Sequence, residues 1–432
     1  MTDVVGPTVV RDSITMRQYL LATMIGGAFL QQVITKAPFE VIAGYFLIIF
    51  NCCVLMGSRS LIIYPAHLKF ILLLLGLSIV GAFAAGYSYL ASIPQVLGIS
   101  VLSVYYFSVI SVLDIPVVRL LELYARAAFY VAVIGIGLYL YHAFQSTGPS
   151  RLQSIFSEPA LFIHATLPGI SFYAFDWFKR RRGLIPLLTL LVAYALADSA
   201  LGFIGILVTA SLLFPRKSPL VLILTPVLCV AIFIGIYTVS GGFRERVNDA
   251  LNTEIVSEST TGASDFDQKN LGNTNVSVMA LFSNAYVAYR AFLTNPLIGT
   301  GLGTHRYSYD RYAGDVLKTE ANTALQLNRD DANSLFLRVT SELGLFGLGS
   351  IVFFFVYFGR VRGPTAILVR NSLIPFFIVY VLRMGHYFQL EFELCIMLFV
   401  FNFIEDRARV SFERKAMLMD RSGRMEGENL GR

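Results

Sequence analysis

Long apolar runs, separated by short polar turns, divide most of this chain into segments long enough to cross a membrane. A helix needs roughly 20 consecutive apolar residues to span a bilayer. Twelve runs reach or approach that length, and they cover residues 17–34, 39–57, 69–90, 95–113, 120–144, 159–178, 184–197, 200–215, 219–240, 335–358, 366–384 and 389–404. The pattern predicts an all-α polytopic membrane protein with about twelve transmembrane helices. Because the runs are continuous and do not alternate, an outer-membrane β-barrel is excluded.

These runs divide the chain into four regions. Residues 1–240 carry the first nine spans, 241–334 form one large loop, 335–404 carry the last three spans, and 405–432 form a polar tail. The seventh and eighth spans are short, so we expect them to form a tight hairpin that turns at 197–199.

The basic residues of the short loops indicate how the chain is oriented. In the predicted arrangement one side of the membrane holds Arg59, Lys69, Arg119, Lys179 to Arg182, Arg216, Lys217, Arg360, Arg362 and the tail from Arg407 to Lys415. The short loops of the other side carry only Lys36 and Arg151. Because lysine and arginine accumulate in cytoplasmic loops, we expect both termini in the cytoplasm and the loop 241–334 on the outer side.

Composition agrees with a membrane protein. The 432 residues are 56% hydrophobic and 14% charged, whereas a soluble chain carries roughly 25% charged residues. The net charge of +6 lies in the short loops between spans, so it does not indicate a nucleic-acid partner.

The large outer loop has parts of different character. Residues 245–276 are polar with almost no aromatic residues, which favours a flap that opens and closes over a site. Residues 276–294 have the periodicity of an amphipathic helix at the membrane surface, and Asn295-Pro296 ends it. A glycine-rich turn, GTGLG at 299–303, and a segment with bases and tyrosines follow.

Charged residues occur inside the tenth apolar run, where charge is costly. Arg338 and Glu342 lie in its first turns, and Asp331 precedes Arg338 by seven residues. At 3.6 residues per turn these three side chains share one helical face. Charge at the edge of the hydrocarbon region usually has a partner or a function. We expect this face to point into a cavity, with Arg338 as an anion clamp or as the partner of Glu342.

Further polar residues collect near the outer ends of the spans and in the large loop. They are Arg151, Glu158, His164, Asp198, Arg290, His305, Arg306, Tyr307, Arg311, Asp330, Asp331 and Asn333, with Arg383, His386, Glu391 and Glu393 near the last two spans. We expect them to line one cavity. Arginine grips phosphate and pyrophosphate with a fork of donors, and tyrosine rings suit the C–H faces of sugars.

Each group also has a purely structural interpretation. Arg151 and Glu158 would be a surface pair, with Glu158 at the start of the helix whose first residue is Pro159. His164 would be a core histidine with its hydrogen bonds satisfied, and His305 and Arg306 would be solvated loop residues. Near the inner end of the fifth span, Glu122 and Arg126 have the i,i+4 spacing of a structural ion pair.

Motifs for metals and cofactors are absent from the sequence, so we expect neither. GTGLG lacks a preceding strand and a following Walker lysine, which excludes a nucleotide-binding loop. We expect its glycines to let backbone N–H groups approach an anion.

Three motifs, taken in order, resemble the O-antigen polymerase and O-antigen ligase superfamily. They are Arg151 followed by SEPALF at 157–162, NPLIGTGLG at 295–303 and ANSLFLRVTSELGLFGL at 332–348. The large outer loop between the ninth and tenth spans is similar as well. The resemblance covers roughly residues 120–360, and beyond them it extends only to hydropathy.

The resemblance implies a metal-independent glycosyltransferase of the C-type membrane fold in the bacterial inner membrane. Its substrate would be an undecaprenyl-pyrophosphate-linked oligosaccharide at the periplasmic face, with a chain-length regulator and a flippase as further partners. The resemblance assigns Arg151 and Glu158 to the motif that contains the Glu-Pro dipeptide at 158–159. It assigns Asn333 to the asparagine of a His-Asn dipeptide that is usual in the ligases. Here Ala332 replaces that histidine, which favours a polymerase over a ligase.

The general base is therefore open at this point. His305 is the first candidate because its ordinary pKa suits proton transfer near neutral pH, Asp331 is the second, and Glu158 is a further catalytic candidate. Pyrophosphate and glycan would be bound by Arg151, Arg290, Arg306, Tyr307, Arg311, Asn333, Arg338 and Glu342.

The predicted activity is the polymerisation of lipid-linked repeat units into O-antigen, capsule or exopolysaccharide. Two alternatives remain open. A ligase would transfer the glycan to lipid A-core or to protein, and a flippase or secondary transporter would move the lipid-linked glycan across the membrane. Transporters place their site near the midplane, often between inverted repeats, whereas the charges of this chain gather at one face and no internal repeat is visible.

Overall fold

The computed structural model describes residues 8–30, 34–35, 41–145, 151–213, 276–317 and 326–430, and four single positions between 234 and 248. Most of this part of the chain is helical. The exceptions in regular structure are β1 (Ile34–Thr35) and β2 (Val41–Ile42), which pair antiparallel.

Helices occupy the positions of the predicted spans wherever the structure describes them. They are α1 (Thr8–Leu30), α2 (Ala43–Gly57), α3 (Pro65–Ala85), α4 (Ser92–Leu113), α5 (Val117–Gln145), α6 (Pro159–Arg180), α7 (Leu184–Ala197), α8 (Ala200–Leu213), α16 (Leu335–Phe358), α17 (Pro364–Arg383) and α18 (Leu390–Leu430). The predicted span 219–240 and the predicted flap 245–276 lie outside the described residues, apart from single positions.

Several of these helices are suited to a membrane. Five described segments are long and apolar enough to cross one: α3, α4 with the short 3-10 helix η1 (Tyr89–Ala91) before it, α5, α16 and α17. The shorter helices α2, α7 and α8 are apolar too. The protein is thus a helical, membrane-embedded protein.

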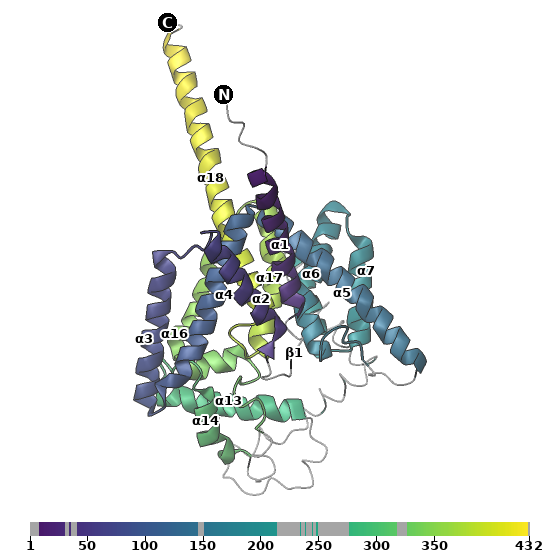
Figure 1. Cartoon of the computed structure of the whole chain (residues 1–432), viewed down its shortest axis with the longest axis vertical. Coiled ribbons are helices and arrows are strands. Elements are labelled where there is room, and N and C mark those ends of the chain that lie inside the picture. The colour runs from purple at the N-terminus through teal and green to yellow at the C-terminus, as the bar shows by residue number, and fades with distance from the viewer. Residues whose placement is uncertain are drawn as a thin grey trace.

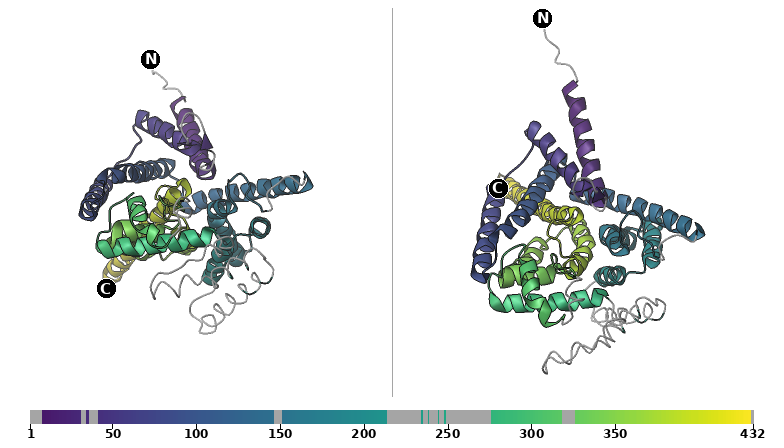
Figure 2. Two further views of the ribbon diagram at one scale, coloured as in Figure 1. Left: turned by 90° about the horizontal axis from the view of Figure 1, so that it is seen from below. Right: turned by 60° about the horizontal axis from the view of Figure 1, so that its bottom comes forward.

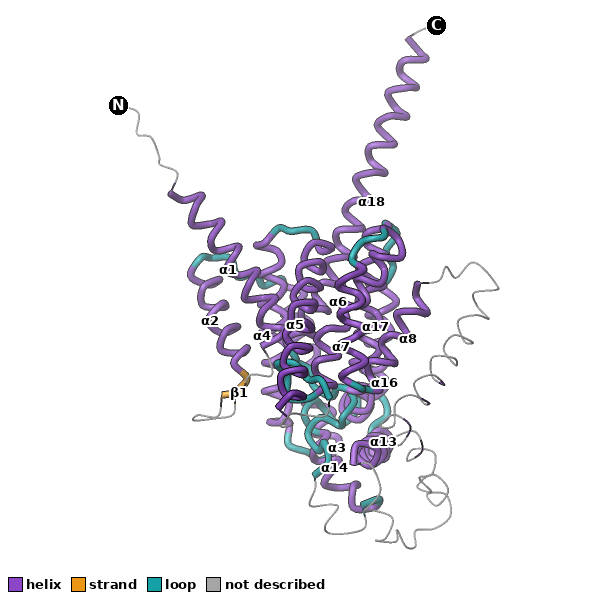
Figure 3. The backbone as a smooth tube through the Cα atoms, turned by 90° about the vertical axis from the view of Figure 1, so that its right-hand side faces the viewer, coloured by secondary structure: helices purple, strands orange, loops and turns teal. Residues whose placement is uncertain are grey.

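The remaining helices lie at one end of the bundle. Figure 1 shows α13 (Val276–Thr294) crossing that end almost at right angles to the long helices, with α14 (His305–Tyr312) beyond it. The first residue of α1 and the last residue of α18 lie at the opposite end, and α18 projects well past the bundle (Figures 1 and 3). Seen from the α13 end in Figure 2, α13 covers the helices of the C-terminal half.

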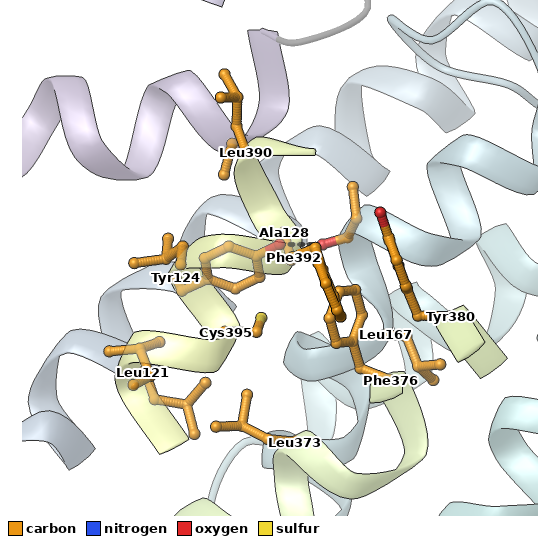
Figure 4. Packing of buried hydrophobic residues seen from close by; sticks show 14 of the residues in the cluster. Leu121, Tyr124, Ala128, Leu167, Leu373, Phe376, Tyr380, Leu390, Phe392 and Cys395 are labelled. Atoms are coloured by element: carbon orange, nitrogen blue, oxygen red, sulfur yellow. Dashed lines mark hydrogen bonds between the residues drawn. The ribbon is translucent and has the colours of Figure 1, made fainter. Parts of the chain in front are cut away.

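The core lies where α5, α6, α17 and α18 meet (Figure 4). The rings of Tyr380 and Phe392 stack with their centroids 4.0 Å apart and their planes at 3°. The Tyr124 hydroxyl donates a 2.7 Å hydrogen bond to the carbonyl of Ala165, so it is not left unpaired between the helices.

Two local predictions are confirmed, the first of them in part. The chain turns at Asp198 and Ser199 between α7 and α8, as expected, and Asp198 takes the left-handed conformation with φ of 41°, but the two helices pack against α6 and not closely against each other. Glu122 forms an ion pair with Arg126, as its spacing indicates, and a second one with Arg119.

Candidate functional site

The helix α16 is broken one third of the way along its length. Gly344 has φ of 55° and ψ of −144°, which is outside the helical region. Four backbone hydrogen bonds join the two sides of this break to the loop after α13: Leu345 N to Pro296 O at 2.8 Å, Phe346 N to Leu297 O at 2.9 Å, Thr300 N to Ser341 O at 3.0 Å and Gly301 N to Glu342 O at 2.8 Å. The groups that the break leaves unpaired are therefore satisfied by another segment, as burial requires.

The glycines of this loop serve close packing. Gly299, Gly301 and Gly303 all have positive φ. A Cβ on Gly301 would overlap the carbonyl oxygen of Ser78 in α3, so only glycine lets the loop enter between α3 and α16. The prediction that these backbone N–H groups approach an anion is wrong for Gly301, because its N–H donates to the carbonyl of Glu342.

Arg338 and Glu342 form a buried ion pair just before the break. Their side chains are 4% and 0% exposed, and Arg338 Nε lies 3.2 Å from Glu342 Oε1. Arg338 Nη1 also donates to Gly385 O at 2.8 Å, and its guanidinium lies 4.4 Å from the centre of the Tyr387 ring. The Tyr387 hydroxyl donates to Glu342 Oε2 at 2.8 Å. Of the two predicted roles of Arg338, the structure shows the partner of Glu342.

His305 belongs to the same buried cluster. Its backbone N–H donates to Glu342 Oε1 at 3.1 Å, its Nδ1 lies 2.9 Å from Ser341 Oγ, and its Nε2 lies 3.0 Å from Asn284 Oδ1. The Asn284 amide nitrogen donates to two backbone carbonyls, which leaves Oδ1 to accept from Nε2–H of the neutral ring.

This environment decides the charge of His305. Complete burial, and then the positive charge of Arg338, lower the pKa of His305 to about 3. The ring is neutral near pH 7, and both of its nitrogens are already hydrogen bonded. In this conformation His305 positions its neighbours and is not available to take a proton from a sugar hydroxyl.

Asp331 lies beside the cluster, at the surface. The helix α16 begins only at Leu335, after the N-cap residue Ser334, so Asp331 does not share a helical face with Arg338 as predicted. Ala332 and Asn333 both have positive φ, of 58° and 54°, and this turn carries the chain away from the helix axis. Asp331 Oδ1 accepts from the backbone N–H of Asn333 at 3.0 Å.

A histidine from another element faces Asp331. His386 lies in the loop between α17 and α18, and its Nε2 is 3.3 Å from Asp331 Oδ2. The His386 side chain is 51% exposed and that of Asp331 is 17% exposed, so this pair is open to solvent while the Arg338–Glu342 pair is not.

Arginines and tyrosines alternate on the outer surface of α13 and α14, and Tyr87, which follows α3, packs against Tyr307 of α14. We call this set the tyrosine–arginine surface: Tyr87, Tyr286, Arg290, Arg306, Tyr307, Arg311 and Tyr312. Guanidinium carbons lie over rings at 5.3 Å for Arg290 and Tyr312, 4.9 Å for Arg306 and Tyr307 and 5.4 Å for Arg311 and Tyr312. The structure thus brings together four predicted binding residues and Tyr312 of the expected aromatic cluster, and it adds Tyr87 and Tyr286, which the sequence did not single out.

Arg151 is hydrogen bonded to the end of α7, whereas Glu158 precedes α6 with an exposed side chain. Arg151 Nε donates to the carbonyl of Ala197 at the end of α7, at 3.2 Å. Glu158 is the N-cap residue of α6 with Pro159 after it, as its structural interpretation predicted, but its exposed side chain makes no capping hydrogen bond. His164 is buried in the core as expected, yet neither ring nitrogen has a hydrogen-bond partner among the described residues.

An apolar cavity of about 570 Å³ lies next to the buried cluster. Side chains of α3, α4, α16, α17 and α18 line it, most of them Phe, Leu and Ile. Tyr387 lines this cavity and also donates to Glu342, so one side chain connects the cavity with the polar cluster. A hydrocarbon chain with a polar head matches this combination of surfaces.

Sequence reasoning missed Asn284, Ser341, Gly385 and Tyr387 as parts of the site. Their partners lie 21 to 47 positions away along the chain, beyond the reach of helical spacing. The signal that was available is the short polar segment Gly385-His386-Tyr387 between two apolar spans.

Comparisons with protein-family models, with curated proteins and with solved structures gave no match for this chain. The resemblance to the O-antigen polymerase and ligase superfamily therefore rests on the sequence motifs alone.

Proposed function

We propose that this protein is a membrane glycosyltransferase that polymerises undecaprenyl-pyrophosphate-linked oligosaccharide repeat units. The observation that carries the proposal is the position of Tyr387, which borders both the apolar cavity and the Arg338–Glu342 cluster. Such a substrate has a long hydrocarbon chain, an anionic head and a glycan. It needs an apolar, a cationic and an aromatic surface next to one another in space. Those three kinds of surface occur here on neighbouring elements.

The isoprenoid chain would enter the cavity along α16. Burial of apolar surface stabilises such a complex by about 25 cal/mol per Å². Most of the cavity wall is apolar, and its polar residues are Ser103, Ser350, Tyr387 and Glu393. Its place among membrane-embedded helices would let the chain enter from the hydrocarbon region of the bilayer.

The pyrophosphate would be bound by arginines that still have donors to offer. Arg338 is a poor candidate because its donors point at Glu342 and at Gly385. Arg290, with a side chain 44% exposed, and Arg306 and Arg311 lie nearer the surface, over tyrosine rings. Their charge would stabilise the pyrophosphate as it leaves, and the tyrosines would pack against sugar rings.

In this proposal the loop elements α13 and α14 face the periplasm, and the ends of α1 and α18 face the cytoplasm of a bacterium. The basic residues at the start of α17 and along α18 support this orientation. Polymerisation would then take place where exported repeat units arrive.

The test uses purified protein in nanodiscs with EDTA and the undecaprenyl-pyrophosphate-linked repeat unit. A ladder of lipid-linked oligomers in mass spectra, with free undecaprenyl pyrophosphate, is the expected result. Product that forms only after lipid A-core is added would replace polymerase by ligase. Absence of turnover with both acceptors would reject a glycosyltransferase.

One observation favours a second candidate, a transporter of lipid-linked glycans. Broken helices often mark transport sites, and α16 is broken at Gly344. The double variant Arg290→Ala, Arg311→Ala separates the two activities. In cells, a polymerase should lose the oligomer ladder while lipid-linked repeat units are still exported across the membrane, whereas a transporter should lose that export.

A further inference from the structure

The segment Gly385-His386-Tyr387 is anchored at each of its three residues. Gly385 O accepts from Arg338 Nη1 at 2.8 Å, His386 O accepts from the Tyr380 hydroxyl at 2.7 Å, and the Tyr387 hydroxyl donates to Glu342 at 2.8 Å. A Cβ on Gly385 would overlap the carbonyl oxygen of Asp331, so only glycine lets this segment pack so closely against the turn at 331–333.

This anchoring fixes an exposed imidazole beside a carboxylate. Gly385 and Tyr387 are buried, whereas the ring of His386 between them is half exposed. Asp331 is fixed as well, because its Oδ1 accepts from Asn333 N–H and its Oδ2 lies 3.3 Å from His386 Nε2. Because the Asp331 carboxylate lies beside Nε2, it favours a proton on that nitrogen, and Nδ1 is the nitrogen left to accept another.

We propose that His386 is the general base of the glycosyl transfer and that Asp331 is its positioning residue. The inference rests on the proposed function and names the residue that this function requires for proton transfer. It replaces His305, which is buried and neutral, by a histidine that an acceptor sugar can reach.

The acceptor hydroxyl oxygen attacks the anomeric carbon of the donor, and a C–O bond forms. The bond between that carbon and the pyrophosphate oxygen breaks, and its electron pair leaves with the lipid pyrophosphate. The hydroxyl proton goes to His386 Nδ1, and the Asp331 carboxylate stabilises the imidazolium.

Other charges also face this ring. Burial lowers the pKa of His386 below its ordinary value; Asp331 opposes this and raises it, Arg338 of α16 lowers it further, and Asp330 raises it slightly. Replacing Asp331 by asparagine removes the nearest of these charges and keeps the side-chain shape. The variant should therefore shift the acid limb of the pH–rate profile toward lower pH.

The experiment compares wild type with His386→Gln, His386→Ala and Asp331→Asn, and follows release of undecaprenyl pyrophosphate between pH 5 and pH 9. His386→Gln should lower kcat by about 10²- to 10⁴-fold, with little change in the KM of the lipid-linked substrate. Imidazole added to His386→Ala should restore part of the rate, because the site is open to solvent.

The matched control is His67→Gln. His67 lies in the first turn of α3 with its ring 4.9 Å from that of Phe107, and the variant should have the wild-type rate. If His386→Gln has the same kcat and pH profile as the unmutated protein, the inference is overturned. The proposed function would still stand in that case, because the unmutated protein releases undecaprenyl pyrophosphate. A loss of activity in His386→Ala that imidazole does not restore would assign His386 a structural role and also overturn the inference. A wild-type protein without any release would reject the proposed function itself.

Discussion

At the scale of single residues, the site is built around two charges that neutralise each other. Arg338 and Glu342 use their donors and acceptors on one another, on Gly385, on His305 and on Tyr387. An ion removed from water without its partner costs several kcal/mol. This pair therefore fixes the geometry of three segments, α14, α16 and the loop before α18, against one another.

Breaking this pair should destabilise the fold. We expect Glu342→Gln and Arg338→Met each to lower the free energy of unfolding by about 3–5 kcal/mol, because each leaves one buried charge without its partner. Denaturant unfolding in detergent, followed by circular dichroism, measures this. Glu122→Gln is the control, since its exposed ion pairs should contribute less than about 1 kcal/mol. Equal stability of the Glu342 and Glu122 variants would contradict the assignment.

His305 should make stability depend on pH. Its folded pKa of about 3 is below its unfolded value of about 6.5, so the unfolded chain binds more protons in between. The contribution of His305 to the free energy of unfolding is fully present above pH 6.5 and is lost as the pH falls. Between pH 7 and pH 5 the loss should be about 2 kcal/mol, and His305→Gln should remove it.

The measurement is the difference between the unfolding free energies of wild type and His305→Gln at the two pH values. Other titrating groups contribute equally to both proteins and cancel. An identical pH dependence in the two proteins would show that His305 is not held neutral by its surroundings.

At the scale of elements, the break in α16 lets a loop reach the centre of the bundle. Gly344 combines φ of 55° with ψ of −144°, and a Cβ there would meet the carbonyl oxygen of Pro296 at 2.5 Å. Gly349 lies in the same helix with open space around its Cα position. These two glycines therefore allow a matched comparison of strain and helix propensity.

Gly344→Ala should destabilise the protein and Gly349→Ala should not. The first change adds strain of about 1–3 kcal/mol and displaces the loop from α16. The second should stabilise the helix by up to about 1 kcal/mol. Thermal unfolding of both variants checks this pair of outcomes, and a Gly344→Ala variant as stable as wild type would mean that α16 is continuous.

The same elements show what could be predicted from the sequence. Hydropathy located the helices because each span is encoded locally, and α16 begins at Leu335 as expected. The break at Gly344 was not predicted, since LFLRVTSELGLFGL reads as one apolar run and its cause is a loop some 45 residues upstream. Likewise, i,i+4 spacing paired Arg338 with Glu342, whereas no local rule brings Tyr387 or Asn284 to them.

At the scale of the whole molecule, the protein joins two environments. The apolar cavity lies among helices suited to the membrane, and the tyrosine–arginine surface lies on α13 and α14 at the end of the bundle. The Arg338–Glu342 cluster is linked to both: Tyr387 lines the cavity and donates to Glu342, and Glu342 accepts from the backbone N–H of His305 at the start of α14. A lipid in the cavity would thus have its polar head next to the tyrosine–arginine surface.

This arrangement predicts that the cavity selects the lipid and not the sugar. Ser103→Phe adds a ring to the cavity wall on α4, and it should raise the KM for the undecaprenyl-linked substrate at least about tenfold, since displaced methylenes lose about 0.8 kcal/mol each. A substrate with a short prenyl chain should be affected little, because it does not fill the cavity. Ile93→Phe, on the exposed side of α4, is the control. If Ser103→Phe impairs long and short substrates equally, the cavity is not the lipid site and the polar face must act without it.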